Sequence, residues 1–133
     1  MATPPYADQV TISQGVWGTV QYEYPGTCSA AISPAEREIV LYLPVTAETP
    51  KRVYLQGYYF AAITGTVVSA TKSNSDGFFQ LALTAGTYSA FVKEGTQYYT
   101  NLPISQFMSL VTVATGKTTH LDFVFHTPPP PSL

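Results

Sequence analysis

Residues 65–94 read GTVVSATKSNSDGFFQLALTAGTYSAFVKE, and this stretch decides the fold class. Glycine-containing turns at Asp76-Gly77 and at residues 84–86 divide it into short runs that are rich in β-branched and aromatic side chains. An Asp-Gly pair between apolar runs is a strong signal for a hairpin, and β-branched residues favour extended backbone. The stretch therefore predicts a β-meander of three strands, at residues 66–72, 78–83 and 87–93.

Alternation with a period of two continues on both sides of this stretch and predicts further strands. These are residues 15–24, 37–44, 107–113 and 118–126. Residues 28–35 indicate a loop, and the region 45–62 is irregular, with a short strand or loop expected around residues 53–59. About seven short strands separated by frequent turn signals are typical of a two-sheet sandwich, and a closed barrel is the alternative architecture.

The two ends of the chain are predicted to lie outside the sandwich. Residues 1–14 form an N-terminal extension with prolines near its start, and residues 127–133 form a tail with four consecutive prolines. Because a proline run adopts a stiff, extended conformation, such a tail is typical of a spacer between domains. The sequence thus predicts one β-sandwich domain at residues 15–126.

Composition narrows the class of function. Only 11% of the 133 residues are charged, the formal net charge is −2, and 14% of residues are aromatic. The six Lys and Arg residues are scattered along the chain, so the sequence predicts no groove for nucleic acid. The apolar runs are too short to cross a bilayer, and we expect no membrane insertion. A surface made largely of Thr, Ser, Asn, Gln and Tyr is common on exported proteins.

Several segments resemble a known family. Residues 70–83, with the following Ala85-Gly86-Thr87-Tyr88, are similar to the carboxypeptidase regulatory-like family, although Thr84 stands where that family commonly carries proline. The turn at residues 115–118 and the early Gly18-Thr19-Val20 also look like this family. The resemblance implies an all-β, seven-stranded Greek-key β-sandwich of the prealbumin-like (transthyretin-like) type.

Family members are accessory modules of peptidases, receptors and surface proteins, and the family has no catalytic motif to carry over. We therefore expect a non-enzymatic accessory, structural or protein-interaction module of a bacterial protein, located outside the cell, on its surface or in the periplasm. The expected partner is another protein or a neighbouring domain, with self-association through edge strands as a further option. A purine-pathway hydrolase shares the fold, but its terminal Tyr-Arg-Gly-Ser is absent from a chain that ends in His126, Thr127 and a proline tail.

Candidate catalytic and metal-binding residues each have a simpler structural interpretation. His120, Asp122 and His126 share one face of the last predicted strand, where alternate side chains lie about 7 Å apart. Two imidazoles and a carboxylate are possible metal ligands, but polar residues opposite an apolar face are what any half-buried strand requires. Cys28 has no nucleophile signature around it and is expected to be a structural loop residue. We expect no catalytic residue, no metal and no cofactor.

Aromatic pairs are the remaining candidates for a binding site. Tyr58, Tyr59, Tyr98 and Tyr99 lie in two segments of adjacent tyrosines, so one member of each pair is expected to face outward. An exposed tyrosine offers apolar area and a hydroxyl, which suits stacking on sugar rings or packing in a protein interface. A carbohydrate-binding module that uses these four residues is therefore the alternative function, and packing at the ends of the sandwich is the structural interpretation.

Overall fold

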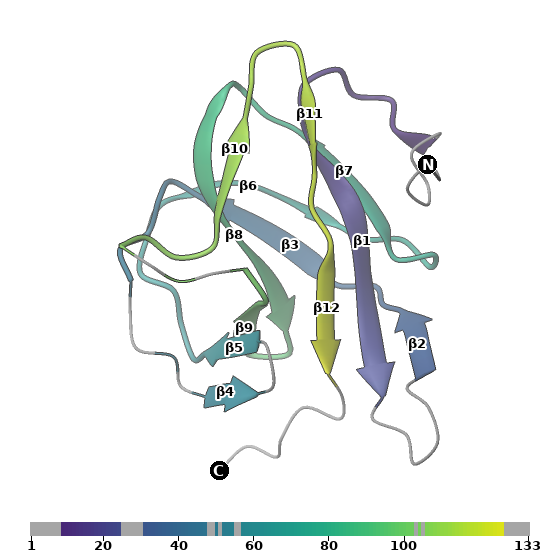
Figure 1. Cartoon of the computed structure of the whole chain (residues 1–133), viewed down its shortest axis with the longest axis vertical. Coiled ribbons are helices and arrows are strands. Elements are labelled where there is room, and N and C mark those ends of the chain that lie inside the picture. Colours follow the sequence, from purple (N-terminus) through teal and green to yellow (C-terminus); the bar gives the residue numbers. More distant parts are fainter. Residues whose placement is uncertain are drawn as a thin grey trace.

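The computed structural model of the chain describes residues 9–24, 31–47, 50, 52–54, 57–102, 104 and 106–126. Two β-sheets pack face to face in these residues, which confirms the predicted all-β sandwich (Figure 1). The described residues form twelve strands: β1 (Gly15–Tyr24), β2 (Ala31–Pro34), β3 (Glu38–Tyr42), β4 (Arg52–Tyr54), β5 (Gly57–Phe60), β6 (Val67–Lys72), β7 (Phe78–Ala82), β8 (Gly86–Glu94), β9 (Gln97–Thr100), β10 (Leu110–Val113), β11 (Thr118–His120) and β12 (Phe123–His126).

The long strand β1 is the centre of the first sheet. Along one edge it pairs antiparallel, first with β7 and then with β2. Along the other edge it pairs parallel, first with β11 and then with β12. Ten residues give β1 enough length to hold two strands end to end on each side, as Figure 1 shows.

The second sheet has the order β4-β5-β9-β8-β3-β6, and β10 pairs with the first half of β8. All its neighbouring strands are antiparallel. A β-bulge interrupts the pairing of β3 with β6 between Leu41 and Tyr42. Strand β6 has β3 as its only partner within the described part of the chain, so it forms one edge of this sheet.

The main core fills the space between the sheets. It contains one face of β1, including Val16 and Val20, and Phe79 and Phe123 from its neighbours. The second sheet contributes alternate residues from β3 and β8, as the period-two pattern requires. These residues are Ile39, Leu41, Tyr88, Ala90 and Val92.

A second apolar cluster covers the other face of the second sheet. Val40 and Tyr42 of β3 pack there with Phe60, Phe91 and Met108, which explains why both faces of β3 are buried. The chain around Val45 and Met108 lies over this face, and the N–H of Met108 donates to the carbonyl of Val45 at 2.8 Å. The molecule therefore has a small outer core in addition to the one between the sheets.

The meander predicted for residues 66–93 is wrong in its pairing. The three strands exist as β6, β7 and β8, but β6 and β8 pair with β3, whereas β7 pairs with β1 in the other sheet. The turn before β7 is instead a crossing between sheets. Its backbone is fixed by Asn74, whose Oδ1 accepts the N–H groups of Asp76 and Phe78. The prediction failed because an Asx turn reverses the chain without dictating which sheet the next strand joins.

The number of strands also differs from the predicted seven. Residues 31–34, expected within a loop, form the strand β2, and the irregular region 45–62 contains the hairpin of β4 and β5. The predicted last strand, residues 118–126, is divided into β11 and β12 by Leu121 and Asp122. Cys28 and the proline tail lie outside the described residues.

Side-chain amides hold the segment that enters β1. Oε1 of Gln80 accepts the backbone N–H of Thr11 at 2.9 Å, and Nε2 of Gln80 donates to the Thr11 hydroxyl at 2.9 Å. Gln14 donates to the carbonyl of Leu83 and accepts the N–H of Gly116. This segment and residues 82–84 line a shallow, open hollow of about 500 Å³. No helix among the described residues is long and apolar enough to span a membrane.

Candidate functional site

The break between β11 and β12 brings together the most concentrated group of polar side chains that sequence reasoning singled out. At Leu121 the backbone still follows β1, and its N–H donates to the carbonyl of Trp17 at 2.8 Å. One residue later the side chain of Asp122 makes the hydrogen bonds to β1 instead of the backbone. Its Oδ1 accepts the backbone N–H of Thr19 at 2.9 Å and the Thr19 hydroxyl at 3.0 Å. The carboxylate therefore fills the position of a strand carbonyl where the ladder is interrupted.

Gly18 makes this close approach possible. A Cβ atom at Gly18 would lie 1.7 Å from the carbonyl oxygen of Leu121 and 3.0 Å from Oδ1 of Asp122. Any side chain at this position would collide with the backbone of the opposite strand. The Gly18-Thr19 pair thus has a specific role here, since glycine leaves room for the break and Asp122 accepts two hydrogen bonds from threonine.

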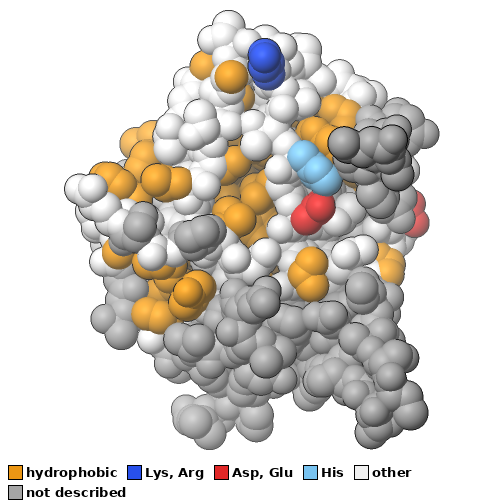
Figure 2. Space-filling view, in the orientation of Figure 1, with side chains coloured by type: hydrophobic (Ala, Val, Ile, Leu, Met, Phe, Trp, Pro, Cys, Tyr) orange, Lys and Arg blue, Asp and Glu red, His pale blue; other side chains and the backbone are white. Residues whose placement is uncertain are grey.

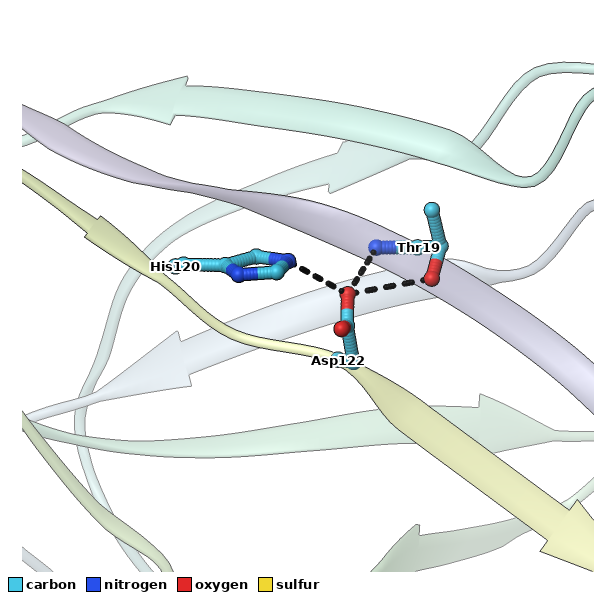
Figure 3. Close-up of polar contacts among 3 residues, drawn as sticks. All are labelled: Thr19, His120 and Asp122. Atoms are coloured by element: carbon cyan, nitrogen blue, oxygen red, sulfur yellow. Dashed lines mark hydrogen bonds and ion pairs between the residues drawn. The ribbon is translucent and has the colours of Figure 1, made fainter. Parts of the chain in front are cut away.

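His120 completes the cluster from the end of β11. Its Nε2 donates to Oδ1 of Asp122 at 3.0 Å, and its ring stacks on Trp17 with 4.1 Å between ring centroids and 7° between planes. Figure 3 shows His120 and Thr19 on opposite sides of the same carboxylate oxygen. The two side chains His120 and Asp122 are 34% and 43% exposed, whereas Thr19 is buried.

The hydrogen bonds of this cluster do not match nucleophilic catalysis. An activated hydroxyl must donate to a base such as imidazole, and a third group then orients that base. Here the Thr19 hydroxyl donates to the carboxylate instead, and Oδ1 of Asp122 accepts from three donors. The cluster therefore stabilises the contact between the divided last strand and β1.

The distance between the side chains of His120 and Asp122 also differs from the expected one. His120 and Asp122 were expected about 7 Å apart, yet Nε2 and Oδ1 are in direct contact at 3.0 Å because the strand breaks between them. The side chain of His126 lies outside the part that the structure describes. Within that part, no group of three or more His, Cys, Asp or Glu side chains is placed to hold a metal ion.

Of the four candidate binding tyrosines, Tyr59 and Tyr99 are in the main core. They face each other across β5 and β9 with 4.9 Å between ring centroids, and each is 0% exposed. The Tyr99 hydroxyl donates to the carbonyl of Val124 at 2.7 Å and so links the two sheets. Burial, and then the neighbouring Tyr59, raise the pKa of Tyr99 above its ordinary value. Tyr59 and Tyr99 are therefore the inward-facing member of each pair, and neither ring is accessible to a ligand.

Tyr58 and Tyr98 face the other side of the sheet, as alternation requires. Both are half-buried and pack against the outer cluster around Tyr42 and Phe60. Burial foremost, and then a hydrogen bond with Tyr98, raise the pKa of Tyr42 above its ordinary value. These two rings therefore pack on the outer core, and only part of their surface is open to a ligand.

Sequence reasoning missed the most exposed apolar side chains. Val67 and Val68, both on the edge strand β6, are 56% and 42% exposed, and Leu43 beside them is also exposed. Leu43 is joined to the start of β6 by its N–H, which donates to the carbonyl of Thr66. The available signal was the adjacent pair Val67-Val68, because alternation places two consecutive valines on opposite faces of a strand. Apolar side chains also reach the surface in several places on the face shown in Figure 2.

Comparisons with known proteins add no assignment. No family model matches the chain, and no curated protein and no solved structure gives a significant match.

Proposed function

We propose that this chain is a non-catalytic interaction module of an exported or surface-located bacterial protein, and that it binds a protein partner through the edge strand β6. The observation that carries the proposal is the edge of β6, which no other described strand covers, with its exposed Val67 and Val68. An edge strand offers unpaired backbone donors and acceptors, and natural proteins commonly protect such an edge with charges or bulges. Here the strand has one charged residue, Lys72, at its end, and its bulge lies near its start, so residues 69–72 keep a regular edge.

The cluster of Thr19, His120 and Asp122 supports the non-catalytic part of the proposal. Oδ1 of Asp122 already accepts from the backbone N–H and the hydroxyl of Thr19 and from Nε2 of His120. Three features support a location outside the cell or on its surface. They are the low charge of the chain, its many hydroxyl-bearing residues and the resemblance of residues 70–88 to modules of surface proteins.

Addition of a partner strand to an exposed edge is a recurring mode of protein recognition. Main-chain hydrogen bonds supply affinity, and the side chains of alternate residues supply specificity. Strand β6 suits this mode because both its unpaired edge and its valine side chains are accessible. The carbohydrate-binding alternative loses two of its four residues, since Tyr59 and Tyr99 are buried.

The test is affinity capture from envelope extracts with three versions of the chain. Val68→Lys places a charge on the edge and is expected to remove at least nine tenths of the captured partner. Ala85→Lys adds the same charge at an exposed turn between β7 and β8 and is expected to retain it. Equal capture by both variants would contradict the proposed surface, and hydrolytic turnover by the purified, folded chain would contradict the non-catalytic assignment.

A further inference from the structure

We infer that the side chains of Trp17, His120 and Asp122 form a docking site for the guanidinium group of an arginine on a partner protein. The site lies on the outer face of the first sheet, whereas β6 is an edge of the second sheet. The inference therefore goes beyond the proposed β6 contact and does not depend on it. It follows from a carboxylate oxygen, an uncompensated charge and an aromatic face that the hydrogen bonds of the cluster leave available.

The carboxylate of Asp122 has one oxygen left for a ligand. The hydrogen bonds from the N–H and the hydroxyl of Thr19 and from Nε2 of His120 all end on Oδ1. Oδ2 has no hydrogen-bond partner in the part of the chain that the structure describes, and Figure 3 shows this second oxygen without a drawn contact. The side chain is 43% exposed. Because donors surround Oδ1, the accessible part of the carboxylate includes Oδ2.

The negative charge of Asp122 is not neutralised within the described residues. An ionised carboxylate only accepts hydrogen bonds, so Nε2 of His120 carries the proton of their contact, and Nδ1 of the neutral ring is an acceptor. Asp122 forms no ion pair with a described Lys or Arg. The next outward residues of β1 and β12 are the uncharged Gln21 and Val124, which pair with each other. The site therefore favours a cation that donates hydrogen bonds.

An aromatic face lies beside this carboxylate. The rings of His120 and Trp17 are stacked nearly parallel, with 4.1 Å between their centroids. Trp17 covers one face of the imidazole, so the exposed 34% of the His120 side chain lies on the opposite face and on the ring edge. Nε2 of His120 and Oδ1 of Asp122 are 3.0 Å apart. A planar cation that lies on the exposed face of the imidazole is therefore within hydrogen-bond reach of Oδ2.

Guanidinium combines the properties that this site requires. It is planar, always positively charged and only weakly hydrated, so it stacks on aromatic rings while its edge donates hydrogen bonds to a carboxylate. A lysine ammonium supplies the charge, but it is more strongly hydrated and cannot stack. Arginine is also enriched in protein interfaces, where lysine is depleted. The occupant that fits the site is therefore an arginine side chain of a protein.

The first test titrates the wild-type chain with N-acetyl-arginine amide and with the matching citrulline and lysine amides. Citrulline has nearly the same shape as arginine but no charge. Because the chain has one tryptophan, the indole N–H signal in a heteronuclear NMR spectrum reports on Trp17 alone. The arginine ligand is expected to shift this signal saturably in low-salt buffer at about pH 8, above the range in which free imidazole titrates. The citrulline ligand is expected to bind at least about fivefold more weakly, since it lacks the ion pair and the cation–π contact. The lysine ligand, which cannot stack, is expected to bind at least about twofold more weakly.

The second test locates the ligand. Asp122→Asn removes the charge but keeps an oxygen that accepts from Thr19, so this variant is expected to fold and to bind the arginine ligand at least about fivefold more weakly. Glu36→Gln removes one exposed carboxylate between β2 and β3 and is the matched control, expected to bind like the wild type. Nuclear Overhauser contacts between the δ-methylene protons of the arginine ligand and the ring protons of His120 are expected in the wild-type chain.

Three outcomes would overturn the inference. One is the lack of a saturable shift with the arginine ligand up to about 50 mM, a concentration at which even weak single-group contacts are detected. Another is equal affinity for the arginine ligand and either of the other two, a comparison that needs no variant and so holds even if Asp122→Asn does not fold. The third is a folded Asp122→Asn chain that binds arginine like the wild type. None of these outcomes bears on the β6 surface, which the capture experiment with Val68→Lys tests separately.

Discussion

The side chain of Asp122 accepts the backbone N–H of Thr19 at 2.9 Å, although the two residues are 103 positions apart in the chain. The same oxygen accepts the buried hydroxyl of Thr19 at 3.0 Å. A side chain thus takes the place of a main-chain carbonyl where the last strand divides into β11 and β12. This contact joins the last strand to the first, and two predictions about stability depend on it.

Asp122→Ala leaves the N–H and the hydroxyl of Thr19 without their acceptor in a buried position. We expect the free energy of unfolding to fall by about 1–3 kcal/mol, the cost of an unsatisfied buried donor. Urea denaturation followed by tryptophan fluorescence measures this, since Trp17 lies beside the cluster. Asp76→Ala removes an exposed carboxylate in a turn and is the matched control, expected to change stability by less than about 0.5 kcal/mol. Equal effects of the two variants would contradict the role given to Asp122.

Gly18→Ala places a Cβ atom 1.7 Å from the carbonyl oxygen of Leu121, and backbone on both sides prevents relief. We expect a loss of more than about 4 kcal/mol or failure to fold, seen as lost soluble yield and a flattened thermal transition. The control is Gly116→Ala, which has no neighbour within 4 Å but a φ of 70°. Its expected cost is only the left-handed strain, about 1–2 kcal/mol. A Gly18→Ala chain as stable as this control would show that the two strands do not approach so closely.

Tyr99→Phe removes the hydrogen bond to the carbonyl of Val124 while keeping the buried ring. The expected loss is about 1–2 kcal/mol in the free energy of unfolding at neutral pH. Tyr58→Phe removes a hydroxyl from a half-buried ring on the opposite face and is expected to cost less than about 0.5 kcal/mol. Chemical denaturation of both variants in parallel would detect the difference. A larger loss of stability for Tyr58→Phe than for Tyr99→Phe would show that the Tyr99 hydroxyl does not stabilise the contact between the sheets.

Alkaline pH should destabilise the fold through its buried tyrosines. Burial raises the pKa of Tyr42 and of Tyr99 above the ordinary value of 10.0, so the folded state holds these phenols neutral when the unfolded chain ionises them. The unfolded state then binds fewer protons, and stability is retained below about pH 9 and falls as the pH rises above about 10. Each group contributes a slope of up to about 1.4 kcal/mol per pH unit.

Denaturation midpoints measured from pH 8 to about pH 12 test this, with the window set by the ordinary tyrosine pKa of about 10. Tyr99→Phe is expected to reduce the alkaline slope, although it lowers stability at neutral pH. A variant with the same slope as the wild type would show that Tyr99 ionises equally in both states.

The period-two alternation of the sequence determined the longer strands. The strand predicted at residues 87–93 corresponds to β8, whose Tyr88, Ala90 and Val92 lie in the main core, because a strand with one face in the core must repeat apolar residues at every second position. The bounds of β1 were likewise evident from its alternation and from the Pro25-Gly26 pair that follows it. These are local properties, which neighbouring residues in the sequence decide.

Only the tertiary structure decided which strands become neighbours. Strands β6, β7 and β8 are consecutive and separated by short turns, yet β7 joins the other sheet, because its apolar face completes the core opposite β8. The division of residues 118–126 at Asp122 depends on Gly18, about a hundred residues earlier, which leaves room for the break. The two pairs of adjacent tyrosines show the same dependence on distant contacts. Alternation placed the members of each pair on opposite faces of the sheet, but only the outer cluster around Met108 determined that the outer face is covered as well. Contacts of this range depend on how distant segments pack, and no local pattern specifies them.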